Sequence, residues 1–338
     1  MKHKIGLLGF GTVGKGISEI LRDKKEFLNT KYGYEYDIVA VADFAFGNVY
    51  NPDGLDIPLM LEQAGNKEKF TKDLTDMETL DLIKNSNVTV WCELTYTDLN
   101  TGGPAIDHVK TALSAGKHIV TSNKGPAALL YPEMKKLADE NGVKFMIEGT
   151  VCAGTPVINL TDGPLAGCKI SKISGILNGT TNYMLSEMEK GMSYDEVLKI
   201  AQELGYAEAD PTGDVEGYDA RGKVTILANI VMDAGIKISD VPCQGITKIT
   251  PEDIDFAKKQ GKRWKLLGSV EMKDGKVITS VAPEMVDISH PLAGVMGATN
   301  ALTFATDMLG DVTIVGPGAG KIETGFSILT DLLAIHRN

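Results

Sequence analysis

The chain has 338 residues, which is long enough for two domains and a sizeable buried core. Its 34 basic and 45 acidic side chains give a net charge of −11, and so acidic a surface repels nucleic acids and anionic membranes. No apolar run has the length of a membrane span, and the short N-terminal apolar stretch is better interpreted as a strand than as a signal peptide. The four cysteines form no CxxC pair and the five histidines have no metal-ligand spacing, so we expect a cytoplasmic protein with reduced thiols.

The first part of the chain alternates between strand-like and helix-like segments. Apolar, β-branched runs predict strands at Ile5–Leu8, Ile38–Val41, Val88–Trp91, His118–Val120 and Val143–Ile147. Helical patterns lie between them, at Val13–Leu21, at Leu74–Ile83, and in segments that start at Pro104 and at Pro132. This alternation predicts an α/β fold with a mainly parallel sheet and helices on both of its faces.

The pattern changes after Glu148. Helices are predicted after Thr180, from the capping box Ser193–Glu196 through Leu204, and from Gly217 to Ala234, and strand-like runs at Trp264–Met272 and Val277–Ala282 flank an Asp-Gly hairpin signal. We therefore expect a mixed α+β domain over residues 148–315. The apolar-periodic helix Ile322–Ala334 can return to the first domain, which would then comprise residues 1–147 and 316–338.

The first strand runs directly into a glycine-rich turn that opens a helix, with the sequence Gly9-Phe10-Gly11-Thr12-Val13-Gly14. The GxGxxG pattern alone is weak, but a preceding strand and a following helix are the context of a dinucleotide-binding loop. The first glycine allows the tight turn, the second a close approach to the pyrophosphate, and the third close helix–strand packing. A glycine turn without a ligand is the alternative. We predict that these six residues bind a dinucleotide cofactor.

Asp43 ends the second strand, where an acidic side chain can hydrogen-bond the ribose 2′-hydroxyl. No Arg or Lys occurs between Asp43 and Lys67 to receive a 2′-phosphate, which favours NAD over NADP. Ligands of such sheets bind beyond the carboxyl ends of the strands, and Thr95 and Lys124 follow the third and fourth strands there. A solvated loop lysine is the alternative interpretation of Lys124. The stretch Gly316–Lys321 is not a phosphate-binding P-loop, but Gly320 can contact a cofactor through its backbone.

An acidic cluster precedes the long helix of the second domain, with carboxylates at Glu208, Asp210, Asp214, Glu216 and Asp219, followed by Lys223. Asp219 and Lys223 are four residues apart at a helix start, so they share one face and can pair. The helix continues into an apolar stretch, so the pair is expected to be partly desolvated, where pKa values can be tuned. A polar loop and a charged helix start are the alternative. Carboxylates beside a lysine suit an amino-acid substrate, with Lys223 moving a proton.

Four segments together resemble the homoserine dehydrogenase family. They are Gly6–Gly14, Thr121–Lys124, Ser174–Tyr183, and Gly205–Pro211 continuing to Asp219–Lys223. The resemblance covers nearly the whole chain. It implies NAD(P)-dependent interconversion of L-homoserine and L-aspartate 4-semialdehyde, in threonine and methionine biosynthesis. It also implies a Rossmann domain and a catalytic domain that forms a homodimer.

The resemblance further assigns roles to individual residues. Lys223 matches the usual proton donor and acceptor, and Lys124 is its rival for that role. Substrate binding is implied for Glu208, Asp214, Asp219 and, from the third segment, Thr180. A structural sodium ion is implied in the hinge, with ligands at Glu148, Val151, Ala153 and Thr155.

Three features depart from the family's pattern. The chain stops before a threonine-binding regulatory domain, no aspartokinase portion precedes the glycine loop, and the segment Thr95–Gly103 differs from the bacterial pattern. We therefore expect the short monofunctional form, without threonine feedback of the usual kind. The alternatives are a nucleotide-sensing protein without turnover and an acylating semialdehyde dehydrogenase, which needs a nucleophilic cysteine, with Cys152 the best-placed candidate.

Overall fold

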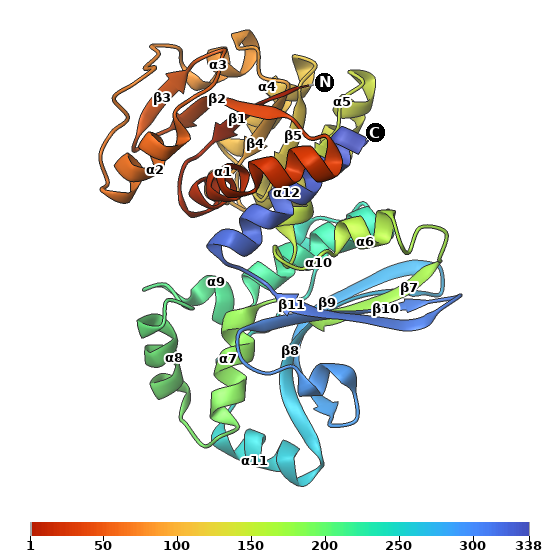
Figure 1. The fold of residues 1–338 in the computed structure, drawn as a ribbon. Helices are drawn as coiled ribbons and strands as arrows, with labels where there is room; N and C mark the ends of the chain where they lie inside the picture. The colour runs from red at the N-terminus through yellow and green to blue at the C-terminus, as the bar shows by residue number, and fades with distance from the viewer. Residues whose placement is uncertain (1, 338) are drawn as a thin grey trace. The chain divides into compact units, whose positions relative to one another are not determined.

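The computed structural model describes residues 2–337, and the chain divides into two compact units. Residues 1–154 and 320–338 form the first unit, and residues 155–319 form the second. Figure 1 labels most of the helices and strands of both. Within residues 2–337, no helix combines the length and apolar character that a membrane crossing requires.

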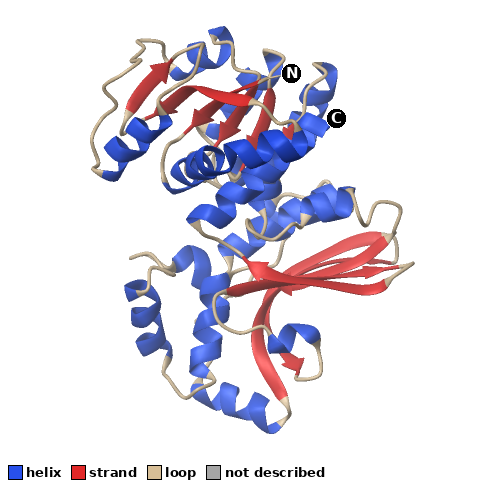
Figure 2. Cartoon of the chain, in the orientation of Figure 1, coloured by secondary structure: helices blue, strands red, loops and turns tan. Residues whose placement is uncertain are grey.

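A six-stranded sheet forms the centre of the first unit, with strand order β3-β2-β1-β4-β5-β6 (Figure 2). The strands are β1 (His3–Leu8), β2 (Tyr36–Asp43), β3 (Gly47–Tyr50), β4 (Val90–Glu93), β5 (His118–Thr121) and β6 (Phe145–Met146). Only β3 pairs antiparallel, with β2, so the predicted mainly parallel sheet is confirmed. The central strands are buried along almost their whole length, as expected of a parallel sheet covered on both faces.

The helices of the first unit are α1 (Thr12–Tyr32), α2 (Ile57–Gly65), α3 (Thr79–Asn85), α4 (Ala105–Ser114), α5 (Lys124–Glu140), the short η1 (Glu148–Thr150) and α12 (Lys321–Arg337). Helix α12 lies directly against α1 (Figure 1). Two glycines make this contact possible. A Cβ on Gly16 would lie 2.1 Å from the Lys321 oxygen, and one on Gly325 would lie 2.8 Å from the Ile17 nitrogen.

Three of the predicted elements differ from those observed. The helix predicted from Leu74 begins only at Thr79, because the backbone around Leu74 pairs with β3 through the Val49–Leu74 bridge. The helix predicted from Pro132 begins at Lys124 instead, and Pro132 is tolerated inside it because Leu130 already breaks the helix with φ −140° and ψ 26°. The strand predicted over 143–147 is confined to residues 145–146.

The second unit contains a five-stranded antiparallel sheet with the order β11-β10-β7-β8-β9 (Figure 1). The strands are β7 (Ile170–Ile176), β8 (Lys262–Lys273), β9 (Lys276–Asp287), β10 (Thr299–Thr306) and β11 (Gly310–Pro317). The helices are α6 (Ile158–Asp162), α7 (Gly179–Met188), α8 (Tyr194–Glu203), α9 (Thr212–Val215), α10 (Tyr218–Val231), α11 (Pro251–Lys259) and the short η2 (Ile238–Asp240) and η3 (Pro291–Gly294). Helices α7 and α10 pack on the sheet, and the predicted Asp-Gly hairpin joins β8 to β9.

Candidate active site

The glycine loop after β1 forms an open cradle at the start of α1. Gly9 has φ 95°, and a Cβ there would lie 3.0 Å from the Leu94 oxygen. A Cβ on Gly14 would lie 2.4 Å from the Gly9 oxygen, so a side chain at position 14 would prevent the helix from packing against the turn. A Cβ on Gly11 would have no atom within 4 Å, so a ligand can approach the backbone there. With the free N–H groups of the α1 N-terminus beside it, this cradle fits the phosphates of a dinucleotide.

The other predicted residues of this loop lie on either side of the cradle. The Phe10 side chain is fully buried in the core of the unit, Val13 packs against the same core, and Thr12 is exposed as the first residue of α1. Phe10 can therefore contact a ligand only through its backbone, whereas the Thr12 side chain is accessible.

Asp43 is held at the end of β2 by three backbone hydrogen bonds. Its Oδ2 accepts from the Phe10 nitrogen at 2.6 Å, and its Oδ1 accepts from the nitrogens of Ala45 at 2.8 Å and Phe46 at 3.0 Å. These bonds tie the carboxylate directly to the glycine loop. An anion is thereby fixed at the position where a Rossmann-type site receives the ribose hydroxyls.

The loops that follow β4 and β5 are joined to each other. The Asn123 amide donates to the Thr95 oxygen at 3.1 Å, while its Oδ1 accepts from the Gly125 nitrogen and caps α5. Lys124 is the first residue of α5, and its nitrogen donates to Thr97 Oγ1 at 3.2 Å. Gly320, with φ 138°, lies immediately before α12. Thr95 and Lys124, predicted separately, therefore come from hydrogen-bonded neighbouring loops.

In the second unit, Asp219 and Lys223 pair as their spacing predicts. Lys223 is only 8% exposed, and its Nζ donates to Asp219 Oδ2 at 2.6 Å and to the Leu177 oxygen at 2.7 Å. The salt bridge lies on the first turns of α10, which continues into a buried apolar stretch. These two contacts hold the Lys223 ammonium group in a fixed position.

Asn178 joins this pair to a second carboxylate, and sequence reasoning assigned it no role. Its Nδ2 donates to Asp214 Oδ1 at 2.6 Å and to Asp219 Oδ2 at 3.1 Å, while its Oδ1 caps α7 by accepting from the Thr181 nitrogen. The only signal in the sequence was an Asn ahead of a helix, which predicts a cap but not its partners. The two carboxylates share one donor, so they form a single site with Lys223.

The environment of Asp214 perturbs this carboxylate. Burial raises the pKa of Asp214 above its ordinary value, and the nearby charge of Asp219 raises it further, while the hydrogen bond from Asn178 and the charge of Lys223 oppose the rise. Thr180 is buried beside this carboxyl, and its one hydroxyl proton is donated to the Tyr206 oxygen at 2.7 Å.

The structure does not join Glu208 to this network. Its side chain is exposed, and among the described residues 2–337 only its backbone oxygen is hydrogen-bonded, accepting from Gln202 Nε2 at 3.1 Å. Of the predicted substrate residues, Asp214, Asp219 and Thr180 are brought together and Glu208 is not.

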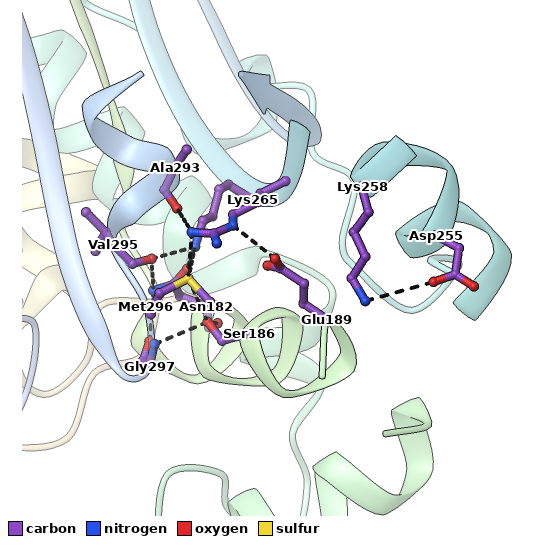
Figure 3. Close-up of polar contacts among 11 residues, drawn as sticks. Asn182, Ser186, Glu189, Asp255, Lys258, Lys265, Ala293, Val295, Met296 and Gly297 are labelled. Atoms are coloured by element: carbon purple, nitrogen blue, oxygen red, sulfur yellow. Dashed lines mark hydrogen bonds and ion pairs between the residues drawn. The ribbon is translucent and has the colours of Figure 1, made fainter. Parts of the chain in front are cut away.

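Helix α7 is anchored near its first turn, through Asn182, by a buried polar cluster (Figure 3). Lys265 on β8 is 1% exposed, and its Nζ donates to Asn182 Oδ1 at 2.9 Å and to the Val295 oxygen at 2.5 Å. Burial lowers the pKa of Lys265 to about 8, and the charge of Arg263 adds to this while that of Glu189 opposes it. The cluster fixes α7, and with it the Asn178 cap, on the sheet.

The segment with the expected sodium ligands is buried. Glu148 is 2% exposed, and its backbone nitrogen donates to Asp331 Oδ2 at 2.9 Å. Val151 is fully buried and Ala153 is 8% exposed, and Thr155, which begins the second unit, is 4% exposed.

A parallel sheet with a dinucleotide cradle, together with a buried lysine–carboxylate site in a second unit, defines the class of nicotinamide-dependent dehydrogenases. Residues 9–148 match the model of the homoserine dehydrogenase NAD-binding domain, and residues 156–333 match the homoserine dehydrogenase model. The chain belongs to the homoserine dehydrogenase family and is an NAD(P)-dependent oxidoreductase.

Individual relatives match over their whole length. The chain is 41% identical to an NAD(+)-dependent homoserine dehydrogenase of Pseudomonas canavaninivorans, covering 100% of this chain and 97% of the relative. It is 43% identical to a homoserine dehydrogenase of Methanocaldococcus jannaschii, covering 98% of each. The crystal structure of a putative homoserine dehydrogenase from Archaeoglobus fulgidus superposes with a TM-score of 0.88 at 38% identity, covering 98% of this chain and 99% of the other.

Proposed function

We propose that Lys223, held by Asp219, exchanges the proton with the substrate oxygen when this homoserine dehydrogenase interconverts L-homoserine and L-aspartate 4-semialdehyde. The observation that carries the proposal is the buried contact of Lys223 Nζ with Asp219 Oδ2 at 2.6 Å and with the Leu177 oxygen. In the direction of reduction, the Lys223 ammonium protonates the oxygen on which negative charge develops. In the direction of oxidation, the neutral amine takes the proton of the hydroxyl.

The bound nicotinamide would supply or accept the hydride. The glycine cradle, Asp43, Thr95, Lys124 and Gly320 are the residues that we propose to hold the cofactor. Support comes from the open space over Gly11 and from the hydrogen bonds that fix Asp43. We propose a preference for NAD, because the fixed carboxylate repels a 2′-phosphate and no basic residue stands between Asp43 and Lys67.

The carboxylates around Asn178 are proposed to bind the amino-acid part of the substrate. Asp214 and Asp219 present negative charge to its α-ammonium group, and Thr180 offers a hydroxyl. Glu208, exposed on the neighbouring loop, is proposed to reach the substrate when it binds.

The experiment compares pH–rate profiles of Lys124→Ala and Lys223→Ala, following NADH absorbance with aspartate 4-semialdehyde. We expect Lys223→Ala to lose the titrating limb that belongs to the proton carrier, while Lys124→Ala keeps it at a lower rate. Loss of that limb in Lys124→Ala alone would transfer the role to Lys124. Wild-type protein that binds NADH but consumes none with this substrate would favour a nucleotide sensor.

We propose that the enzyme is a cytoplasmic homodimer. The support is the family itself, together with exposed apolar side chains on the two edge strands of the second sheet, Ile278 on β9 and Val315 on β11. Light scattering of the purified chain measures its mass, and a monomer at micromolar concentration would contradict the proposal.

We also propose that the segment with Glu148, Val151, Ala153 and Thr155 binds a structural sodium ion. The burial of the Glu148 carboxylate supports this, because a buried anion favours a nearby cation. The melting temperature should be higher in sodium chloride than in choline chloride of equal ionic strength. Equal melting temperatures would contradict the proposal.

A further inference from the structure

Glu93, at the carboxyl end of β4, is a fully buried carboxylate. Its side chain is 0% exposed, and its Oε2 lies 2.6 Å from the Nδ1 of buried His108 on α4. Its other oxygen, Oε1, accepts from the Thr95 nitrogen at 2.9 Å and from the Thr95 hydroxyl. A buried anion is costly unless it is paired and hydrogen-bonded. These two partners together meet that requirement, and one of them is a predicted cofactor residue.

Through Thr95, Glu93 fixes a larger part of the loop. Asn123 holds the same turn from the other side, because its amide donates to the oxygens of Thr95 at 3.1 Å and Tyr96 at 2.8 Å. The Glu93 backbone oxygen accepts from the hydroxyl of Thr121 at 2.7 Å. Hydrogen bonds therefore join the carboxyl ends of β4 and β5 into one cluster, and Glu93 is its buried carboxylate.

The position of this cluster in the sheet relates it to the cofactor. In the strand order β3-β2-β1-β4-β5-β6, the chain adds β2 and β3 on one side of β1 and then β4, β5 and β6 on the other. Open α/β sheets bind their ligands in the crevice at such a switch point. Gly9 borders the crevice on the β1 side, and a Cβ there would lie 3.2 Å from the Thr95 nitrogen. With Asp43 on the side of the adenosine half, Thr95 lies on the side of the nicotinamide half.

We propose that Glu93 and His108 are positioning residues of the dinucleotide site. His108 donates to the buried carboxylate and holds its orientation, and the carboxylate fixes the nitrogen and hydroxyl of Thr95 beside the glycine loop. Neither side chain reaches the cofactor, so both act through Thr95. The inference rests on the proposed cofactor site, and NADH binding by the wild-type protein tests that site separately.

The experiment measures the dissociation constant of NADH by fluorescence titration, together with kcat and the KM values for cofactor and homoserine. Loss of a hydrogen bond to a charged group predicts that His108→Leu raises the NADH dissociation constant and the cofactor KM by about tenfold, with the KM for homoserine almost unchanged. His108→Asn keeps an N–H donor near the place of Nδ1, and it should bind NADH within about threefold of wild type.

Lys117→Met is the matched control. Lys117 is also buried in the first unit, where its Nζ donates to the Ser86 oxygen at 2.8 Å, but it precedes β5 at the opposite end of the strands. This variant should lose stability and keep NADH affinity. Equal loss of affinity in Lys117→Met and His108→Leu would overturn the proposal, and so would wild-type affinity in His108→Leu. If His108→Leu does not fold, Glu93→Met, which has a similar volume but removes both acceptor oxygens, decides by the same titration: unchanged NADH affinity refutes the positioning role.

Discussion

Asn178→Ser removes the amide that joins the two carboxylates of the candidate substrate site but preserves the helix cap. A serine at this position can still accept from the Thr181 nitrogen, as Asn178 Oδ1 does at 2.9 Å. It is too short to replace the Nδ2 contacts with Asp214 at 2.6 Å and Asp219 at 3.1 Å. The substitution therefore tests the bridge rather than the helix.

The expected effect follows from the forces on Asp214. Burial and the charge of Asp219 raise the pKa of Asp214, and the Asn178 hydrogen bond opposes them. A hydrogen bond to a charged group contributes about 1.5–3 kcal/mol, and one pKa unit corresponds to about 1.4 kcal/mol. Loss of the bond should raise the pKa of Asp214 further, although water replaces part of the contact. Under the proposed role of Asp214, only its ionised form binds the substrate ammonium, so the acid limb of kcat/KM should move up by about one pH unit.

Stability provides a second, independent measure. Because the pKa of folded Asp214 lies above its unfolded value, the folded state binds more protons and loses stability as the pH rises through the folded value. Urea unfolding should therefore show a larger deficit of Asn178→Ser against wild type at pH 7.5 than at pH 5. Asn178→Ala, which also loses the cap, should be less stable than Asn178→Ser by about 1 kcal/mol at both pH values. An acid limb at its wild-type position in Asn178→Ser would refute the reasoning.

Three further substitutions test other parts of the molecule. Lys223→Met should lower kcat at least about 100-fold while leaving NADH titration unchanged, whereas Cys152→Ser should stay active; the reverse result, in steady-state assays, would point to thiol chemistry. Wild type should have a higher kcat/KM with NADH than with NADPH, and Asp43→Ala should lower the ratio of the two values. A preference of wild type for NADPH would contradict the role of Asp43. Burial lowers the pKa of Lys265 from 10.5 to about 8, so the unfolded state binds more protons between these values and wild-type stability should rise with pH there. Relative to Lys265→Met, the wild-type free energy of unfolding in urea should rise by about 2.5 kcal/mol from pH 7 to pH 10. Unfolding free energies of the two proteins that change in parallel with pH would contradict the lowered pKa of Lys265.

Features set by local chain geometry could be predicted from the sequence. The glycine loop after the first strand needs only its own residues, because the turn and the helix N-terminus define it. The Asp219–Lys223 pair depends only on the spacing of four residues on a helix, and the contact is present at 2.6 Å. The same local reasoning was wrong around Leu74, because a strand distant in sequence took up the backbone hydrogen bonds that a helix would have used.

Grouping of the acidic residues was predicted only in part. Sequence proximity placed Glu208 with Asp214 and Asp219, yet the Glu208 side chain is exposed and outside the network. Proximity along a loop does not determine which side chains converge, because the turn between them sets their directions.

The sequence by itself determined the class of cofactor, because the glycine spacing acts within one or two turns of the chain, and four of its segments together identified the family. Only the tertiary structure decided that Asn178 bridges carboxylates 36 and 41 residues away, and that Glu93 is held by His108 from a neighbouring helix. Such contacts depend on how sheets and helices pack. A buried polar group takes whichever partner that packing brings within hydrogen-bond distance, and the sequence does not specify that partner.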